Sequence, residues 1–259
     1  MYKIGFIGIG NMGGAILNGL LQSHFVDAEE VMVYDLDKSK MTDAQNKGII
    51  LGECEKDVVE SCDHIVIGVK PQVVEEVLMP LKGVLKNKCL ISIVLGYDFK
   101  MYNTILDAST RHIFVMPNTP VEVLQGMCLI EKENNLLPEE FEYVKNMFES
   151  LGSIEIMTSH DMAIGGALSG CGPAFMYMVM EALADGAVLK GLPREQAYRL
   201  ASQLLIGSGT MLKETKKHPG HLKDQVCSPG GTTIQGVKTL EDHQVRSAFI
   251  EAICNSTKL

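Results

Sequence analysis

The sequence predicts an α/β domain with a parallel sheet over residues 1–158, followed by an all-helical domain over residues 159–259. In the first part, short apolar runs alternate with helical patterns, an order that is typical of repeated β-α-β units. Such units build a parallel sheet that is covered by helices on both faces. After Thr158 the strand-like runs vanish and the remaining patterns are helical. The domain boundary is therefore expected near Ser159.

The first strand, Ile4–Ile7, ends in glycines with the spacing G-x-G-x-x-G, and a helical pattern begins at Ala15. Gly8 allows a tight turn, and Gly10 lacks the Cβ that would keep a pyrophosphate away from the backbone. Gly13 lets the helix pack close to the strand. Phosphates would then lie against the N–H groups at the positive end of the helix.

The second strand, Val31–Tyr34, ends in Asp35, about twenty residues beyond the glycines, where an acid would hold a ribose hydroxyl. An ordinary strand-to-helix turn without a ligand is the alternative interpretation of the glycines alone. The combination of strand, helix and distal acid favours a Rossmann-type dinucleotide site. Its predicted residues are Gly8, Gly10, Asn11, Met12, Gly13 and Asp35.

Two later strands end in stretches that are candidates for the same site. The strand His64–Val69 is followed by Lys70-Pro71, and His112–Met116 is followed by Pro117-Asn118. Open α/β sheets bind ligands at the carboxyl ends of their strands, although both stretches are equally compatible with plain turns. The cofactor-binding candidates added here are Val69, Lys70, Pro71, Met116, Pro117 and Asn118.

The other elements of the first domain follow the same alternation, and Gly152 is expected to stop the last helix. The remaining predicted strands are Ile49–Leu51, Cys89–Val94, Met127–Ile130 and Ile154–Met157, and the remaining helices are Lys38–Lys47, Val73–Leu85 and Glu139–Leu151.

In the helical domain, the predicted helix Ala174–Lys190 carries more apolar residues than one core stripe needs. Either this helix is buried at the centre of its own domain, or it forms a subunit interface. We favour the interface, because a domain of about a hundred residues rarely buries such a helix alone. The other predicted helices are Ala163–Ser169, Arg194–Lys213, Thr233–Leu240 and Val245–Thr257.

The stretch Cys227–Thr233 (Cys-Ser-Pro-Gly-Gly-Thr-Thr) lies just ahead of a helix. Its glycines and threonines would present backbone N–H groups and a hydroxyl in one small concavity, which suits a carboxylate or a phosphate. A glycine turn with a threonine N-cap explains the same residues equally well. The small-residue break Ser169–Pro173 indicates a close helix crossing or, alternatively, a ligand wall.

Composition excludes several classes of protein. A formal net charge of −9 argues against a general nucleic-acid binder, which needs a basic face. The seven cysteines are widely spaced without a C-x-x-C pair, so we expect reduced thiols in a cytoplasmic protein. We expect no secretory signal and no membrane span, because the apolar stretches are interrupted well short of about eighteen residues.

No metal site and no recognisable nucleophile are expected. His218, His221 and Asp224 have a suggestive spacing, but a proline and a glycine interrupt them and no further acids support them. Cys227 has no neighbouring base, so a structural thiol is the better interpretation. Paired carboxylates and a Ser/His/Asp pattern do not stand out either.

Five motifs along the chain resemble one family in their order and spacing. They are Ile4–Gly13, Val69–Pro71, Met116–Pro120, Ser169–Ala174 and the long stretch Leu222–Thr233. That family is the pyrroline-5-carboxylate reductases, and Leu222–Thr233 is similar to its C-terminal signature. The resemblance implies that NAD(P)H reduces the C=N bond of 1-pyrroline-5-carboxylate to L-proline, the last step of proline synthesis. It also implies a homodimer built by the helical domain, with rings of dimers in some members and the active site beside the partner subunit.

On this resemblance the protein mainly supplies positioning and electrostatics, because the basic imine of the substrate obtains its proton largely through solvent. The N–H groups of Gly231, Thr232 and Thr233 are predicted to hold the substrate carboxylate. Thr233 is the catalytic candidate, with its side chain near the ring nitrogen. The substrate-binding candidates are Ser228, Gly230, Gly231, Thr232 and Thr233.

Two residues depart from the family pattern. Cys171 stands where serine or another small residue is usual, and Asp35 stands where many members carry a small or hydroxylated residue. Because Asp35 would face a 2′-phosphate with like charge, NADH is predicted to serve at least as well as NADPH. A β-hydroxyacid-type dehydrogenase is the alternative enzyme, but it needs a lysine that Ala163–Met180 lacks. A catalytically silent cofactor sensor is the alternative of another class.

Overall fold

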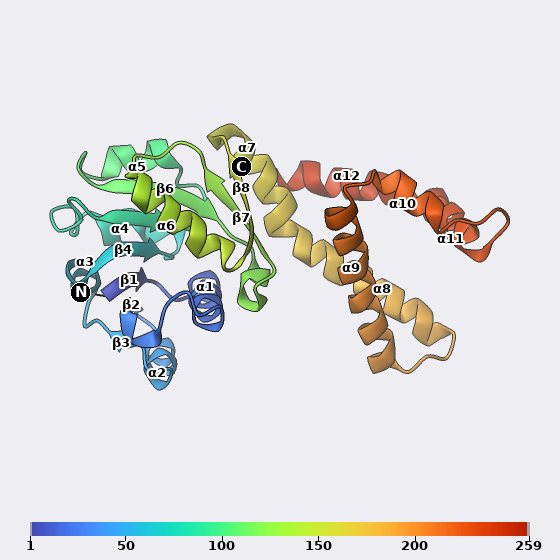
Figure 1. Ribbon diagram of the computed structural model, residues 1–259, viewed down its shortest axis with the longest axis horizontal. Helices are drawn as coiled ribbons and strands as arrows, with labels where there is room; N and C mark the ends of the chain where they lie inside the picture. The colour runs from blue at the N-terminus through green and yellow to red at the C-terminus, as the bar shows by residue number, and fades with distance from the viewer. Residues whose placement is uncertain (1, 258–259) are drawn as a thin grey trace. The chain divides into compact units, whose positions relative to one another are not determined.

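The computed structural model describes residues 2–257 and divides them into two compact units, with the boundary in the chain between Gly170 and Cys171 (Figure 1). The first unit contains one sheet of eight strands in the order β3-β2-β1-β4-β5-β6-β7-β8. The strands are β1 (Tyr2–Ile7), β2 (Val31–Tyr34), β3 (Ile50–Leu51), β4 (Cys62–Ile67), β5 (Cys89–Ser92), β6 (Arg111–Met116), β7 (Gly126–Glu131) and β8 (Gly152–Met157).

Helices connect these strands, and helices joined by short connections make up the described part of the second unit. Those of the first unit are α1 (Asn11–Gln22), α2 (Lys38–Asn46), α3 (Glu55–Ser61), α4 (Val74–Leu78), α5 (Phe99–Ile105), α6 (Pro138–Glu149) and α7 (Ser159–Gly166), with the short 3₁₀ helices η1 (Ala28–Glu30), η2 (Pro71–Val73) and η3 (Thr119–Val123). A π-helical segment, η4 (Ala167–Cys171), leads to α8 (Gly172–Leu189), α9 (Arg194–Thr215), α10 (Pro219–Gln225), α11 (Thr232–Asp242) and α12 (Val245–Ser256).

The predicted parallel sheet is confirmed from β3 through β6, whereas β7 runs antiparallel to β6, with Val115 opposite Ile130. The connection explains the difference. Only residues 117–125 lie between β6 and β7, and a parallel crossover needs about a dozen residues or more. β8 returns parallel to β7 after the crossover helix α6. The carboxyl ends of β1, β4, β5 and β6 therefore share one edge of the sheet.

Apolar residues on alternate positions of the strands build one core on each face of the sheet. In β1, Ile4 and Phe6 pack with Ile16 of α1, while Ile7 packs on the other face with Val58 of α3. This alternation follows from the two-residue period of a strand. Helices α1, α2 and α6 thus contribute to one core, and α3, α4 and α5 contribute to the other.

The helix predicted at Val73–Leu85 is wrong beyond Met79. In the structure α4 ends at Leu78, because Pro80 lacks an N–H and cannot continue an α-helix. The domain boundary expected after residue 158 also lies earlier in the chain than the boundary between the two compact units, which follows Gly170. The reason is that α7 packs on the sheet, where its Met162 joins Phe114 and Leu129 in a small apolar cluster.

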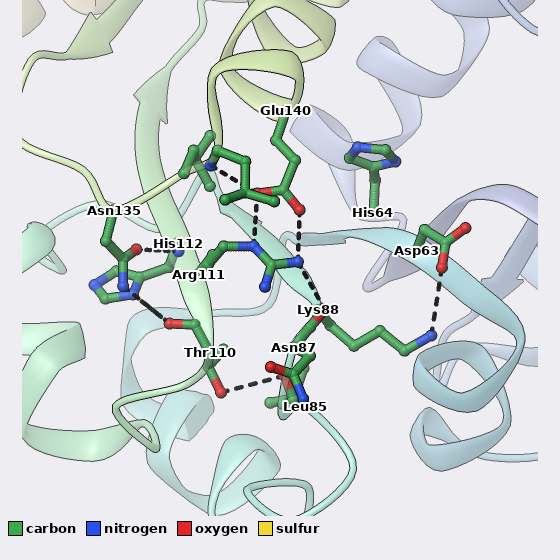
Figure 2. A network of polar contacts seen from close by, with 12 residues as sticks. Asp63, His64, Leu85, Asn87, Lys88, Thr110, Arg111, His112, Asn135 and Glu140 are labelled. Carbon is green, nitrogen blue, oxygen red and sulfur yellow. Dashed lines mark hydrogen bonds and ion pairs between the residues drawn. The ribbon is translucent and has the colours of Figure 1, made fainter.

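A polar network closes the amino-terminal ends of the strands (Figure 2). The Arg111 guanidinium donates two hydrogen bonds of 2.7 Å to the Glu140 carboxylate, one from Nε and one from Nη2, and Nη2 also donates to Asn87 O. Lys88 is paired with Asp63 at 3.7 Å. These groups have protein partners and lie at the edge opposite the carboxyl ends, so their role is structural.

The second unit exposes a broad apolar surface on α8. Ala184 is the residue of α8 that is buried in the single chain. Large apolar side chains of this helix are exposed, namely Met176, Tyr177, Met178, Leu183 and Leu189.

The run Ser159–Leu189 corrects the expectation that every apolar stretch is short. It spans 31 residues and includes an 18-residue window with a mean hydropathy of 1.3, of which 17% is buried in the single chain. By length and composition alone, this run is long enough to cross a membrane. From Ala174 onward, this run lies in the helix that sequence analysis assigned to a subunit interface.

Candidate functional site

The glycine turn between β1 and α1 has the geometry that the motif predicts. Gly8 has a φ of +89°, and its N–H donates to Tyr34 O at 2.9 Å. A Cβ at Gly13 would lie 2.4 Å from Gly8 O, so the helix approaches the strand as closely as only glycine permits. At Gly10 a Cβ would meet only Lys40 Nζ, at 4.0 Å. The space above Gly10 is therefore open to a ligand.

The amino-terminal end of α1 faces that space without a side-chain cap. Gly10 is the N-cap residue, and the first turn contains no acidic side chain. The N–H groups of Asn11 and Met12 belong to this first turn and have no carbonyl of a preceding turn to bond. With the helix dipole they form a suitable cradle for a pyrophosphate.

Asp35 joins the ends of β1 and β2. Its Oδ2 accepts a hydrogen bond from Ile9 N at 2.8 Å, and its Oδ1 accepts one from Asp37 N at 2.8 Å. The carboxylate therefore clamps the glycine turn in place. Each carboxylate oxygen has a second acceptor position, which leaves capacity for a ribose hydroxyl.

A cavity of about 550 Å³ opens beside this clamp. It brings together the predicted residues Gly8, Gly10, Asp35, Val69 and Lys70. They meet because β4, which ends just before Val69, lies next to β1 in the sheet. The predicted Asn11, Met12, Gly13 and Pro71 do not line the cavity, although Asn11 and Pro71 are next in the chain to the lining residues Gly10 and Lys70.

Sequence analysis missed several residues of the cavity wall. Lys40 lies in the first turn of α2, 3.9 Å from Asp37, and Glu55 and Glu76 add acidic groups. The available signal for Lys40 was its place five residues after Asp35, in the turn that follows the second strand. Glu55 and Glu76 come from α3 and α4, and only the folded sheet brings them to the cavity.

Of the predicted residues at this strand end, Met116 is the last residue of β6, and Pro117 and Asn118 follow it; none of the three lines the cavity. All three are buried, and β4 and β5 separate β6 from β1. The Asn118 amide bonds to the main chain: Nδ2 donates to Ser169 O at 2.9 Å, and Oδ1 accepts from Met127 N at 2.8 Å.

The predicted substrate loop lies in the second unit, ahead of α11. Gly230 has a φ of +70°, and Gly231 is the N-cap residue of the helix. Neither Thr232 nor Thr233 caps α11, because both lie inside its first turn. The Gly231 N–H donates to Ser228 O at 3.0 Å, so this predicted donor is engaged within the loop. The loop is exposed in the single chain from Ser228 to Thr233, apart from the half-buried Gly231.

Over residues 2–257, no group of three metal-ligating side chains is present. Asp224 is paired with Lys223 at 2.7 Å, and His218 Nδ1 accepts a hydrogen bond from Gly220 N. Burial raises the pKa of Cys62 and of Cys128 to about 12, so these thiols stay protonated and are poor nucleophiles.

Two family models match the chain. One is described as pyrroline-5-carboxylate reductase dimerisation and matches residues 159–259, and the other, described as NADP oxidoreductase coenzyme F420-dependent, matches residues 3–96.

Whole-length relatives agree with these matches. The chain is 40% identical over 253 residues to a pyrroline-5-carboxylate reductase of Escherichia coli, covering 97% of this chain and 94% of the relative. It is 38% identical over 259 residues to one of Methanosarcina acetivorans, covering 99% and 96%. A crystal structure of the Plasmodium falciparum pyrroline carboxylate reductase with NADP bound superposes with a TM-score of 0.90 at 32% identity, covering 99% of this chain and 96% of that one.

Proposed function

The chain belongs to the pyrroline-5-carboxylate reductase family, and from that premise we propose how its residues divide the work of the reaction. Its reaction is the NAD(P)H-dependent reduction of the C=N bond of 1-pyrroline-5-carboxylate to L-proline, the final step of proline biosynthesis. The glycine turn and its cavity hold the cofactor, and the loop Ser228–Thr233 holds the substrate. The chain is therefore an oxidoreductase that acts on a CH–NH group.

The residues around the glycine turn fit a dinucleotide. Side chains at Gly8 or Gly13 would fill or distort the turn, and the open space at Gly10 admits a pyrophosphate to the backbone. When bound, the reduced nicotinamide supplies the hydride that reduces the imine carbon. The chain's own contribution is to hold the phosphates at the end of α1 and to clamp the turn through Asp35.

The Ser228–Thr233 loop is proposed to bind the substrate carboxylate through the N–H groups of Thr232 and Thr233. Both residues lie in the first turn of α11, where backbone donors and the helix dipole favour an anion. The Thr233 hydroxyl is proposed to lie near the ring nitrogen. The observation that carries this proposal is the glycine N-cap, because it leaves both threonine side chains free of a capping role.

The test is to replace Thr233 by alanine and Gly231 by valine. For Thr233→Ala we expect kcat/KM for the substrate to fall about tenfold to a hundredfold with little change in Tm, because one hydrogen bond to the substrate is lost. Gly231→Val should be worse, since the branched side chain fills the space that the carboxylate needs. Cofactor affinity is the control and should stay unchanged. Normal turnover by either folded variant would show that the loop is only a turn and does not bind the substrate.

NADH is proposed to serve at least as well as NADPH. Asp35 lines the cofactor cavity, where it can accept the ribose hydroxyls and would face a 2′-phosphate with like charge. Lys40 opposes this effect because its ammonium lies on the same cavity wall.

The measurement is kcat/KM for both cofactors in three proteins. Relative to wild type, kcat/KM for NADH should fall about tenfold in Asp35→Ser, because a charge-assisted hydrogen bond is worth about 1.5–3 kcal/mol. Lys40→Gln should lose chiefly NADPH activity. A wild-type enzyme with a strong preference for NADPH would overturn the proposal.

We propose a homodimer in which the exposed apolar face of α8 is buried against a second copy. The support is the match of residues 159–259 to a dimerisation model, together with the apolar side chains exposed on α8. A ring of such dimers extends this proposal. Burial in a dimer also accounts for the apolar run Ser159–Leu189 without a membrane. A cytoplasmic location is supported by the seven cysteines, all of which are free thiols.

A further inference from the structure

The side chain of Asn118 links the carboxyl end of β6 to two other main-chain segments. Asn118 is 8% exposed, and its amide bonds to Met127 N in β7 and to Ser169 O in η4. The partners fix the orientation of the amide, because the Met127 N–H requires an acceptor and the Ser169 carbonyl requires a donor. Both polar atoms of Asn118 are thus engaged inside the first unit.

The element that Asn118 holds is seated closely on the sheet. A Cβ at Gly166 would lie 2.2 Å from Met116 Sδ, and one at Gly165 would lie 2.8 Å from Met157 Sδ. These two glycines let α7 approach β6 and β8. The hydrogen bond from Asn118 to Ser169 then holds η4, the segment after α7, against the sheet as well.

The other end of α7 is also fixed. Ser159 Oγ donates to Glu131 Oε1 at 2.5 Å, and Ser159 N donates to Glu133 Oε2 at 3.1 Å. Glu131 is fully buried at the end of β7 and also accepts from Phe99 N. Residues 159–169 are therefore held at both ends by side chains of the sheet and its connections.

The Asn118 bond reaches the chain where it leaves the first unit. Ser169 lies in the π-helical segment η4, and the next residue, Gly170, is the last of the first unit before the chain enters the second. A π-helical turn interrupts the α-helical hydrogen-bond ladder and is frequent at functional sites. Such a segment is a natural place for the chain to change direction, unless an external bond holds it.

We propose that Asn118 is a positioning residue that latches η4 to the sheet and so fixes the last residues of the first unit, from which the chain continues toward the substrate loop. In this proposal Asn118 acts on the main chain of η4. The sequence motif at the end of β6 had predicted that the same residue binds the cofactor. The catalytic consequence rests on the proposed function, since the proposed substrate loop follows η4 in the chain. Hydride transfer requires close alignment, and a misplacement of about 1 Å costs about a hundredfold in rate.

The sharpest variant is Asn118→Asp. It keeps the volume of the side chain and an acceptor for Met127 N, and it replaces the donor to Ser169 O by an oxygen. Asn118→Ala removes both bonds. The matched control is Asn135→Ala, because Asn135 makes the same kind of amide bridge near the opposite end of β6, accepting from His112 N at 2.6 Å and donating to Thr110 O at 3.2 Å.

The first measurement is hydrogen exchange of the protein without cofactor. Amides of residues 167–172 should exchange about tenfold faster or more in both Asn118 variants and at the wild-type rate in Asn135→Ala. The second is kinetic. The cofactor Kd should stay within about twofold, kcat should fall about tenfold to a hundredfold, and the primary deuterium isotope effect on kcat should rise because hydride transfer becomes slower.

Three results would overturn the proposal. A tenfold weaker cofactor Kd with unchanged exchange at residues 167–172 would make Asn118 a cofactor ligand. If exchange at these amides accelerated equally in Asn135→Ala, the effect of the Asn118 variants would reflect general loss of stability and not a latch. If Asn118→Asp kept the wild-type exchange rates and the wild-type kcat, Asn118 would have no latching role. If the wild-type protein failed to reduce 1-pyrroline-5-carboxylate, the proposed function would fail, and the exchange experiment would still decide the latch.

Discussion

At the scale of single residues, the glycines of the first turn have different physical roles. A Cβ at Gly13 would collide with a backbone oxygen at 2.4 Å, whereas a Cβ at Gly10 would meet only the flexible end of Lys40. Gly10 also has a φ of −62°, which any residue adopts. Gly13 is therefore required by the fold, whereas the space at Gly10 is required only by the proposed cofactor.

This difference predicts opposite phenotypes for two alanine variants. Gly13→Ala should destabilise the protein by about 1–3 kcal/mol even without cofactor, because the backbone must shift. Gly10→Ala should unfold within about 0.5 kcal/mol of wild type, yet bind the cofactor about tenfold more weakly or worse. Urea denaturation and cofactor titration of both variants measure this. Equal loss of stability in the two variants would contradict it.

The residues of the proposed cofactor cavity show how much of this site the sequence can predict. Gly8, Gly10 and Asp35 were predictable, because a local motif fixes the turn and a fixed spacing identifies the acid. Glu55 and Glu76 were not predictable, since they reach the cavity only through packing of α3 and α4 on the sheet. Asn118 followed the motif rule for strand ends, but its amide is occupied by main-chain partners.

At the scale of elements, strands were easier to predict than their directions and short helices. Most strand positions followed from continuous apolar runs between turn residues. The reversal at β7 depends on the length of one connection, which the β-α-β pattern of its neighbours obscured. Helices α3, α5 and α10 have seven residues each, too few to establish a helical period. Tertiary contacts decide such elements.

Two histidines inside strands make stability depend on pH. His64 in β4 stacks on Tyr143 with ring centroids 4.0 Å apart, and His112 in β6 lies 1% exposed beside Phe99. Burial lowers the pKa of both imidazoles below the usual value of about 6.5. The unfolded chain then binds protons that the folded chain does not, so the free energy of unfolding falls as pH drops through about 6.5.

We expect the free energy of unfolding to decrease between about pH 7.5 and about pH 5.5, and the slope to flatten in the double variant His64→Gln/His112→Gln. Urea denaturation at one fixed protein concentration measures it. His160→Gln, at an exposed histidine of α7, is the control and should keep the wild-type slope. Burial raises the pKa of Glu131, which contributes with the opposite sign at lower pH. A slope unchanged in the double variant would contradict the assignment.

At the scale of the whole molecule, the dimer proposal predicts an interface on α8. Met178 is 69% exposed in the single chain. Met178→Glu should weaken the dimer by about tenfold or more, because a charge would be buried without a partner. Met101→Glu, at an exposed methionine of α5 in the first unit, is the matched control. Light scattering over a concentration series measures both variants, and a stable, active wild-type monomer at low micromolar concentration would refute the interface.

The unburied face of α8 also has a consequence for biosynthesis. The first unit has buried cores on both faces of its sheet and precedes the second unit in the chain, so it is equipped to fold first during translation. The second unit leaves apolar side chains of α8 exposed in the single chain, so on the dimer proposal its maturation is a bimolecular step. The proposal then implies that, at low expression, α8 stays exposed to chaperones and proteases for longer before it is covered.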